Sequence, residues 1–172
     1  MPKILPATGG DVVEIILADH RWFEEALREL RDVRSDRSAV LADLATVLIA
    51  HAEAEESKVY PSLRKRHAID AEEVEHSEHE HDEGNEALLE LMEVEDTGSE
   101  EFSEKVHELS EALSHHLDEE ERDVLNPART DVSEEVRRQL GDAFAEERAR
   151  LIDSGCGDIA NVRKIVEAAK QH

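Results

Sequence analysis

The chain has 172 residues, a formal net charge of −24 and only 3% aromatic residues. This length suits a single domain with a substantial hydrophobic core. The strong negative charge argues against nucleic acids and anionic membranes as partners. With 7 glycines, 4 prolines and abundant Leu, Ala, Glu and Arg, the composition favours an all-α protein.

The cysteine content and the N-terminal arm bear on location. Cys156 is the single cysteine, so the chain forms no intramolecular disulfide, which fits a reducing compartment. The arm, residues 1–10, has no long apolar run, so we expect neither a signal peptide nor a membrane span. We therefore predict a cytoplasmic protein.

Apolar periodicity and capping residues predict six helices. They are expected at residues 11–34, 38–60, 71–94, 100–125 and 133–152, and from Asp158 onward. Pro61 predicts a kink or stop near the end of the second helix, and Asn126-Pro127 is expected to end the fourth.

These helices predict a division of the chain into three parts. Residues 1–10 form the arm, residues 11–127 an up-down four-helix bundle, and residues 128–172 an extension of one or two helices packed on the bundle. The extension has no histidine before the terminal His172. It is expected to seal one side of the bundle or to provide a homodimer interface, and the sequence leaves both roles open.

One motif occurs twice along the chain. His51 and Glu55 lie four apart behind a stripe of leucines on the second helix, and His116 and Glu120 repeat the pattern on the fourth. Steps of three and four positions stay on one face of a helix, so both pairs should point into the core. Because buried charges need a partner or a metal, the repeated pair predicts a metal site.

The first and third helices add one histidine each. His20 and His81 take equivalent places when these two helices are aligned, so the four helices are interpreted as two similar α-hairpins. The candidate ligands are His20, His51, Glu55, His81, His116 and Glu120. Four histidines divide into two per metal, and each glutamate can then bridge both ions. Imidazole and carboxylate donors in a bundle core favour two iron ions, with zinc or manganese as alternatives.

The order H…HxxxE…H…HxxxE, with a proline shortly after the second motif helix, resembles the hemerythrin-like HHE cation-binding domain over about residues 11–127. The stretches that carry the resemblance are LADHRWFEEALREL, AHAEAEESKVYP, EHDEGNEALLEL and SHHLDEEERDVLNP. The resemblance implies a four-helix bundle with a non-heme di-iron centre. Members of the family bind or sense O2, buffer or sense iron, or react with peroxide or nitric oxide.

This chain departs from the oxygen-carrying hemerythrins, which have HxxxH on the third helix and HxxxxD on the fourth. Here Ser77 stands four positions before His81, and the fourth helix carries HxxxE. A symmetric site of four histidines and two glutamates is therefore expected to favour reaction with O2, H2O2 or NO over reversible O2 carriage. Catalase-like consumption of peroxide is the candidate enzymatic activity. The alternatives are a non-enzymatic iron or O2/NO sensor or iron-binding protein, and a plain helical interaction module.

The roles of several residues near the motifs are interpreted from their positions alone. Tyr60 and Trp22 are interpreted as packing residues, and Gly84 as a position that leaves room for a bound ligand or for close helix approach. An apolar collar is expected from Leu27, Leu48, Leu88 and Leu113. Any further ligand would come from His76, His79, Glu56 or Glu121, which are otherwise interpreted as solvated side chains.

Overall fold

The computed structural model describes residues 3–4 and 8–171, and those residues form helices and turns without any strand. Residues 1–2 and 5–7 of the predicted arm, and His172, lie outside the described residues. The α-helices are α1 (Val12–Arg31), α2 (Arg37–Ala54), α3 (Tyr60–Lys65), α4 (Ala71–Met92), α5 (Glu100–Glu120), α6 (Asn126–Asp131), α7 (Glu134–Asp153) and α8 (Ile159–Lys170). Two π-helical segments, η1 (Glu55–Val59) and η2 (Glu121–Leu125), lie between α2 and α3 and between α5 and α6.

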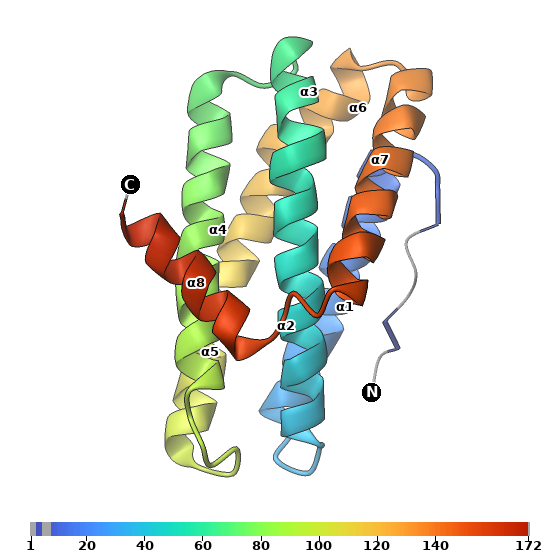
Figure 1. Ribbon diagram of the computed structural model, residues 1–172. Coiled ribbons are helices and arrows are strands. Elements are labelled where there is room, and N and C mark those ends of the chain that lie inside the picture. The colour runs from blue at the N-terminus through green and yellow to red at the C-terminus, as the bar shows by residue number, and fades with distance from the viewer. Residues whose placement is uncertain (1–2, 5–7, 172) are drawn as a thin grey trace.

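The helices form an up-down four-helix bundle with two further helices on its outside (Figure 1). Because α2, η1 and α3 follow one another without a break, as do α5, η2 and α6, the described chain makes six continuous helical stretches. Helix α7 packs against α1 and α2, and α8 lies across α4. The predicted all-α bundle with extra C-terminal helices is confirmed.

Side-chain caps start the bundle helices close to the predicted residues. Asp11, Asp36, Asp70 and Ser99 each accept a hydrogen bond from a backbone N–H in the first turn of the helix that follows. Each cap satisfies an N–H that has no partner within the helix, and such caps contribute about 1 kcal/mol each.

Of the kink or stop expected at Pro61, the stop does not occur, and the expectation that Asn126-Pro127 ends the fourth helix is wrong. Pro61 and Pro127 lie in the first turns of α3 and α6, and the helices continue to Lys65 and Asp131. A π-helical segment ends two positions before each proline. The wider π turn shifts the hydrogen-bond register, so a residue that has no N–H and needs extra room is accommodated there.

The hydrophobic core consists of two clusters with a polar layer between them. The larger cluster includes Phe23, Leu44 and Leu109, and the smaller one includes Ile16 and Phe144. The histidine and glutamate motifs lie along the helices between these clusters. The polar layer is therefore closed off along the bundle axis by apolar packing on both sides.

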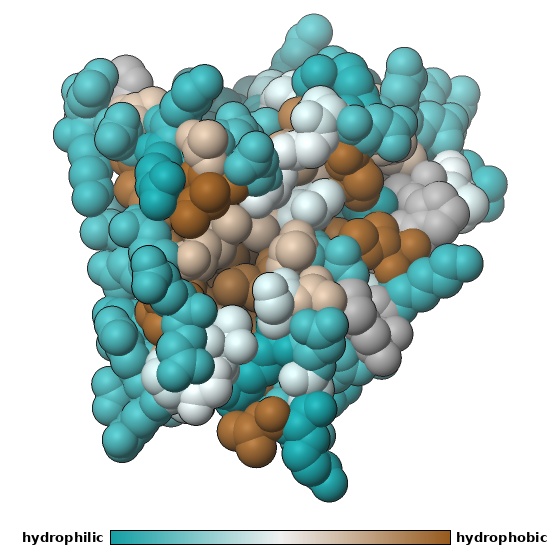
Figure 2. Space-filling view, turned by 60° about the horizontal axis from the view of Figure 1, so that its bottom comes forward, coloured by the Kyte–Doolittle hydropathy of each residue, from teal (hydrophilic) through white to brown (hydrophobic). Residues whose placement is uncertain are grey.

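The C-terminal helices are attached by close backbone contact. A Cβ atom on Gly157, in the turn between α7 and α8, would lie 2.4 Å from the backbone nitrogen of Thr46 on α2, so only glycine fits there. In Figure 2 hydrophilic side chains border the face shown, and hydrophobic ones gather in its middle. Among the described residues Val33 alone is a mostly exposed large hydrophobic side chain. No described helix is both long and apolar enough to cross a bilayer.

Candidate metal centre

The polar layer brings all six predicted ligand residues together. They are buried, with exposed fractions of 0% to 7%: His20, His51, Glu55, His81, His116 and Glu120. They form two groups of potential ligand atoms, and within each group the atoms lie within 4.8 Å of one another. The first group contains His20 and His51, the second contains His81 and His116, and both include the two glutamates.

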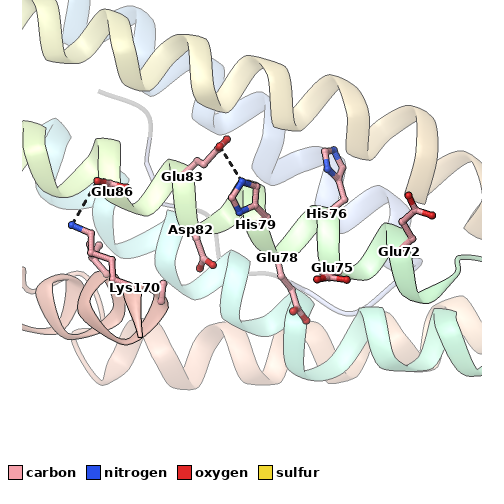
Figure 3. A pocket seen from close by; sticks show the side chains of 11 residues that line it. Glu72, Glu75, His76, Glu78, His79, Asp82, Glu83, Glu86 and Lys170 are labelled. Atoms are coloured by element: carbon pink, nitrogen blue, oxygen red, sulfur yellow. Dashed lines mark ion pairs between the residues drawn. The ribbon is translucent and has the colours of Figure 1, made fainter. Parts of the chain in front are cut away.

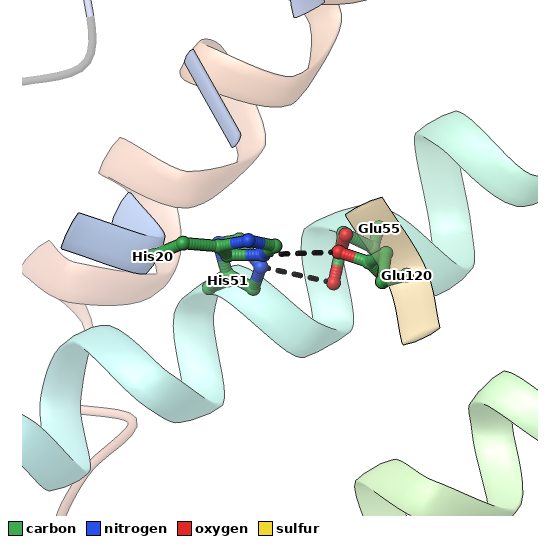
Figure 4. Close-up of side chains that lie close together, drawn as sticks. All are labelled: His20, His51, Glu55 and Glu120. Carbon is green, nitrogen blue, oxygen red and sulfur yellow. Dashed lines mark hydrogen bonds and ion pairs between the residues drawn. The ribbon is translucent and has the colours of Figure 1, made fainter. Parts of the chain in front are cut away.

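Every Nε2 atom in the layer lies close to a motif carboxylate. Glu55 Oε1 is 3.0 Å from His51 Nε2 and 3.3 Å from His81 Nε2. Glu120 lies 3.1 Å from His20 Nε2 and 3.5 Å from His116 Nε2. Figure 4 shows the imidazoles of His20 and His51 pointing toward the carboxylates of Glu55 and Glu120. The glutamates thus occupy the middle of the layer, between the two pairs of imidazoles.

Four further carboxylates hold the outer nitrogens of the imidazoles. His51 Nδ1 lies 2.9 Å from Asp19, and His116 Nδ1 lies 3.2 Å from Glu80. In the same way Glu121 is 3.3 Å from His20 Nδ1, and Glu56 is 3.1 Å from His81 Nδ1. A carboxylate only accepts, so each Nδ1 donates and the ring is fixed with its Nε2 facing the central glutamates.

Sequence reasoning assigned none of these four carboxylates to the imidazoles. The interpretation of Glu56 and Glu121 as solvated charges is wrong, because each is partly buried against a histidine. A signal was present in the repeat. Asp19 and Glu80 each stand directly before a motif histidine, and Glu56 and Glu121 each stand directly after a motif glutamate.

Helix α7 also contributes to the layer. Arg148 donates two hydrogen bonds to Asp19, from Nε at 2.9 Å and from a terminal nitrogen at 2.8 Å. The ring of Phe144 packs edge-on against His51, with centroids 5.5 Å apart. The chain Arg148–Asp19–His51 is buried, so α7 orients one imidazole as well as covering the bundle.

Tyr60 belongs to the site, and its interpretation as a packing residue is incomplete. Its fully buried hydroxyl donates to Glu120 and lies 3.4 Å from His81 Nε2, and its ring stacks on that imidazole. Burial and the charge of Glu120 raise the pKa of the Tyr60 hydroxyl well above its ordinary value. Tyr60 is therefore a fixed proton donor beside the central carboxylates.

Opposite charges face each other inside the layer. Burial alone lowers the pKa of a histidine, but nearby carboxylates outweigh it and raise the pKa of both His51 and His81 to about 10. For Glu55, burial favours the neutral acid, and the charge of His51 overrides it, so the pKa of Glu55 falls well below its usual value. In the metal-free protein, protons occupy positions that a cation can take.

Comparison with known proteins agrees with this geometry. The family model described as the hemerythrin HHE cation binding domain matches residues 11–128. The chain belongs to this family. No curated protein and no solved structure gave a significant match. The matched residues of the HHE domain include every one of the six buried His and Glu side chains.

The side chains of the HHE domain fit a bound cation. Within the described chain, His51 Nε2, His116 Nε2 and both carboxylate oxygens of Glu55 are buried without a hydrogen-bond partner. His51 and Glu55 are close, yet they are not aligned for a hydrogen bond. Each such atom costs about 1–3 kcal/mol unless something satisfies it. Imidazole nitrogens and carboxylate oxygens that converge on one buried point, where a cation can replace the imidazole protons, are the arrangement that metal ligands adopt.

A small cavity adjoins the HHE site. Its volume is about 20 Å³, and its lining includes His51, His81 and His116 together with Leu48, Leu113 and Gly84. This is room for a water or a similarly small molecule. A Cβ atom on Gly84 would lie 3.8 Å from Leu113, so the glycine leaves open space beside the imidazoles. Leu27 and Leu88 of the predicted collar are buried in the larger core cluster.

The remaining histidines of the HHE domain lie outside the central groups. His79 and His107 are exposed and pair with Glu83 and Glu111 one turn along their own helices. His76 joins a separate group with Glu80 and Glu119 at the surface, outside the central layer.

Proposed function

We propose that this HHE domain holds two iron ions in its central layer. His20 and His51 would ligate one ion and His81 and His116 the other, with Glu55 and Glu120 bridging them. The observation that supports the proposal is that two groups of buried ligand atoms share the same two glutamates. The two carboxylates would offset part of the charge of a pair of cations, and the four neutral imidazoles would supply lone pairs, in a core that otherwise excludes ions.

Iron is favoured by the chemistry of the donors. Imidazole nitrogen and carboxylate oxygen suit first-row metals, and dimetal carboxylate sites in helical bundles hold iron or manganese. The lone cysteine, Cys156, is hydrogen-bonded to the backbone of Thr46 on the outer side of α2. The donor set is therefore nitrogen and oxygen throughout, which favours iron over a thiolate zinc site.

We infer that the ligand is a small oxidant such as O2, H2O2 or NO. Bound iron would supply the electron transfer. The surrounding residues select for size, because the cavity of about 20 Å³ beside the imidazoles admits only a few atoms. Apolar walls from Leu48 and Leu113 limit the entry of water. Tyr60 holds a hydroxyl proton next to Glu120, from where it can hydrogen-bond to an oxygen in the layer.

Consumption of peroxide is the activity proposed for this arrangement. The test compares iron-loaded wild-type protein with the double variant Glu55→Ala, Glu120→Ala. Iron-dependent loss of H2O2 in the wild type, abolished in the variant, supports turnover. Binding of NO or O2 without any peroxide loss selects a sensor or an iron-binding protein instead.

Two further expectations stay proposals. We propose that the protein is cytoplasmic, which cell fractionation tests. A homodimer through the C-terminal helices is tested by light scattering of the purified chain, and a mass near 19.4 kDa would reject it.

A further inference from the structure

A second cluster of metal-binding side chains lies on the outer side of α4 and α5. His76 and Glu80 are four positions apart on α4, and His115 and Glu119 are four positions apart on α5. The two pairs face each other across the packed helices. His76 Nε2 lies 2.6 Å from Glu119, and His115 Nε2 lies 3.3 Å from Glu80. Each histidine thus reaches the carboxylate of the other helix.

Glu80 makes this cluster more than a set of surface ion pairs. Its side chain is only 6% exposed. Among the described residues its ion-pair partners are all imidazoles: His76, His115 and His116. Glu119 likewise pairs with His76 and His115 and with no described lysine or arginine. Arg122 acts on Glu119 through its charge but pairs with Asp123. Among the described residues the two converging carboxylates are thus in ion-pair contact with imidazoles alone, and a cation would compensate both.

The distances suit a small divalent cation. In a tetrahedral zinc site with bonds of about 2.0–2.1 Å, neighbouring ligand atoms lie roughly 3.3 Å apart. His76 Nε2 lies 3.5 Å from Glu80 Oε1, close to that value, and single ligand atoms of His76, Glu80 and Glu119 all lie within 4.8 Å of one another. His115 contacts the opposite oxygens of the two carboxylates, at 3.3 Å and 3.2 Å. The contact between His76 and Glu119, at 2.6 Å, would lengthen by less than 1 Å on binding.

The neighbouring surface would attract cations to this cluster. An open groove of about 710 Å³ runs along α4, and His76 lies in its lining (Figure 3). Acidic side chains make up most of the rest of the lining, among them Glu72, Glu75, Glu78 and Asp82. Such a concentration of one sign of charge raises the local concentration of divalent cations.

We propose that His76, Glu80 and Glu119 bind a divalent first-row cation such as Zn²⁺ at the surface, and that His115 positions the two carboxylates from their other side. This outer site uses none of the six central residues. It is nevertheless linked to them, because Glu80 also accepts from His116 Nδ1. Binding of a cation by Glu80 would draw charge away from His116 and change the environment of the central layer.

The test is a count of bound zinc on the full-length, iron-loaded protein. The wild type, the double variant His76→Ala, His115→Ala and the control double variant His79→Ala, His107→Ala are each dialysed against Zn²⁺. Zinc and iron are then both measured by elemental analysis. The control removes two exposed histidines that each pair with a glutamate one turn away on the same helix. Unlike His76 and His115, neither reaches a described carboxylate of the neighbouring helix. Circular dichroism verifies that all three proteins are folded.

We expect one more zinc ion per chain in the wild type and the control than in the His76, His115 variant, at equal iron content. Zinc is also expected to alter the visible absorption of the iron-loaded wild type and not that of the variant. Equal zinc in all three proteins would overturn the outer site. Zinc binding at the cluster with an unchanged spectrum would overturn the link through Glu80. The zinc difference can be measured whatever the central layer holds, so its failure is separate from failure of the iron proposal.

Discussion

The buried chain Arg148–Asp19–His51 yields a quantitative prediction for the substitution Asp19→Asn. The carboxylate of Asp19 receives two hydrogen bonds from Arg148 and one from His51, all between 2.8 and 2.9 Å. The exposed fraction of the side chain is 8% for Asp19, 4% for Arg148 and 3% for His51. Substitution removes the negative charge from this triad and keeps its shape, so the change tests charge and not volume.

The expected losses follow from the burial of the triad. Breaking a buried ion pair costs about 3–5 kcal/mol, and the low end applies because the amide oxygen of asparagine still accepts one hydrogen bond. For a chain of this length, about 3 kcal/mol lowers the Tm by roughly 6–12 °C. Loss of a carboxylate that orients a ligating imidazole weakens metal binding about 10- to 100-fold.

Two assays check these values. Thermal unfolding of the metal-free protein, followed by circular dichroism, gives the change in stability, and competition with a chelator gives the metal affinity. Glu134→Gln is the matched control, because it removes an ion pair with Arg138 on the same helix in which both side chains are about two-thirds exposed. Exposed pairs contribute about 0–1 kcal/mol. If Asp19→Asn unfolds and binds metal as the control does, α7 has no part in orienting His51.

Three further predictions concern other parts of the layer. Gly84→Ala is expected to stabilise the protein by up to about 1 kcal/mol, because alanine has the higher helix propensity and its methyl group has space there. The same methyl group is expected to weaken azide binding to the iron-loaded protein, and unchanged azide affinity would mean that ligands enter elsewhere. Tyr60→Phe removes a buried hydrogen bond to the Glu120 carboxylate and is expected to cost about 1.5–3 kcal/mol in urea unfolding, whereas a cost near zero would show that the hydroxyl is not bonded. Since the pKa of His51 and of His81 is raised from 6.5 to about 10, their ion pairs fully stabilise the metal-free fold below pH 6.5, and this stabilisation is lost as the pH rises through 10. Metal binding must displace the same protons, so the metal affinity rises as the pH rises from 6.5 to 10. Calorimetry in buffers of different ionisation enthalpy should detect the released protons. A metal affinity independent of pH would contradict the assignment of His51 and His81 as ligands.

The six residues of the central layer could be predicted from the sequence because they continue the apolar stripes of their helices. His51 and Glu55 follow buried leucines in helical steps, and the same pattern returns at His116 and Glu120. The direction of each side chain was thus set by periodicity within one helix. The grouping of all six residues needed only the antiparallel packing of two similar hairpins.

The outer contacts could not be predicted in the same way. Asp19 and Glu80 touch histidines on neighbouring helices, so their roles depend on how those helices are rotated against each other. Arg148 comes from a helix without histidines, and nothing in its local sequence marks it as a partner of Asp19. The continuation of helices past Pro61 depends on a π turn, a feature for which single-sequence patterns give no signal.

Binding of two iron ions by the buried layer through shared glutamates is tested most directly by iron analysis of the reconstituted full-length protein beside the double variant Glu55→Ala, Glu120→Ala. We expect two iron ions per chain in the wild type and loss of stoichiometric iron in the variant. A folded variant that retains two iron ions, or a wild type that binds none, would contradict this expectation.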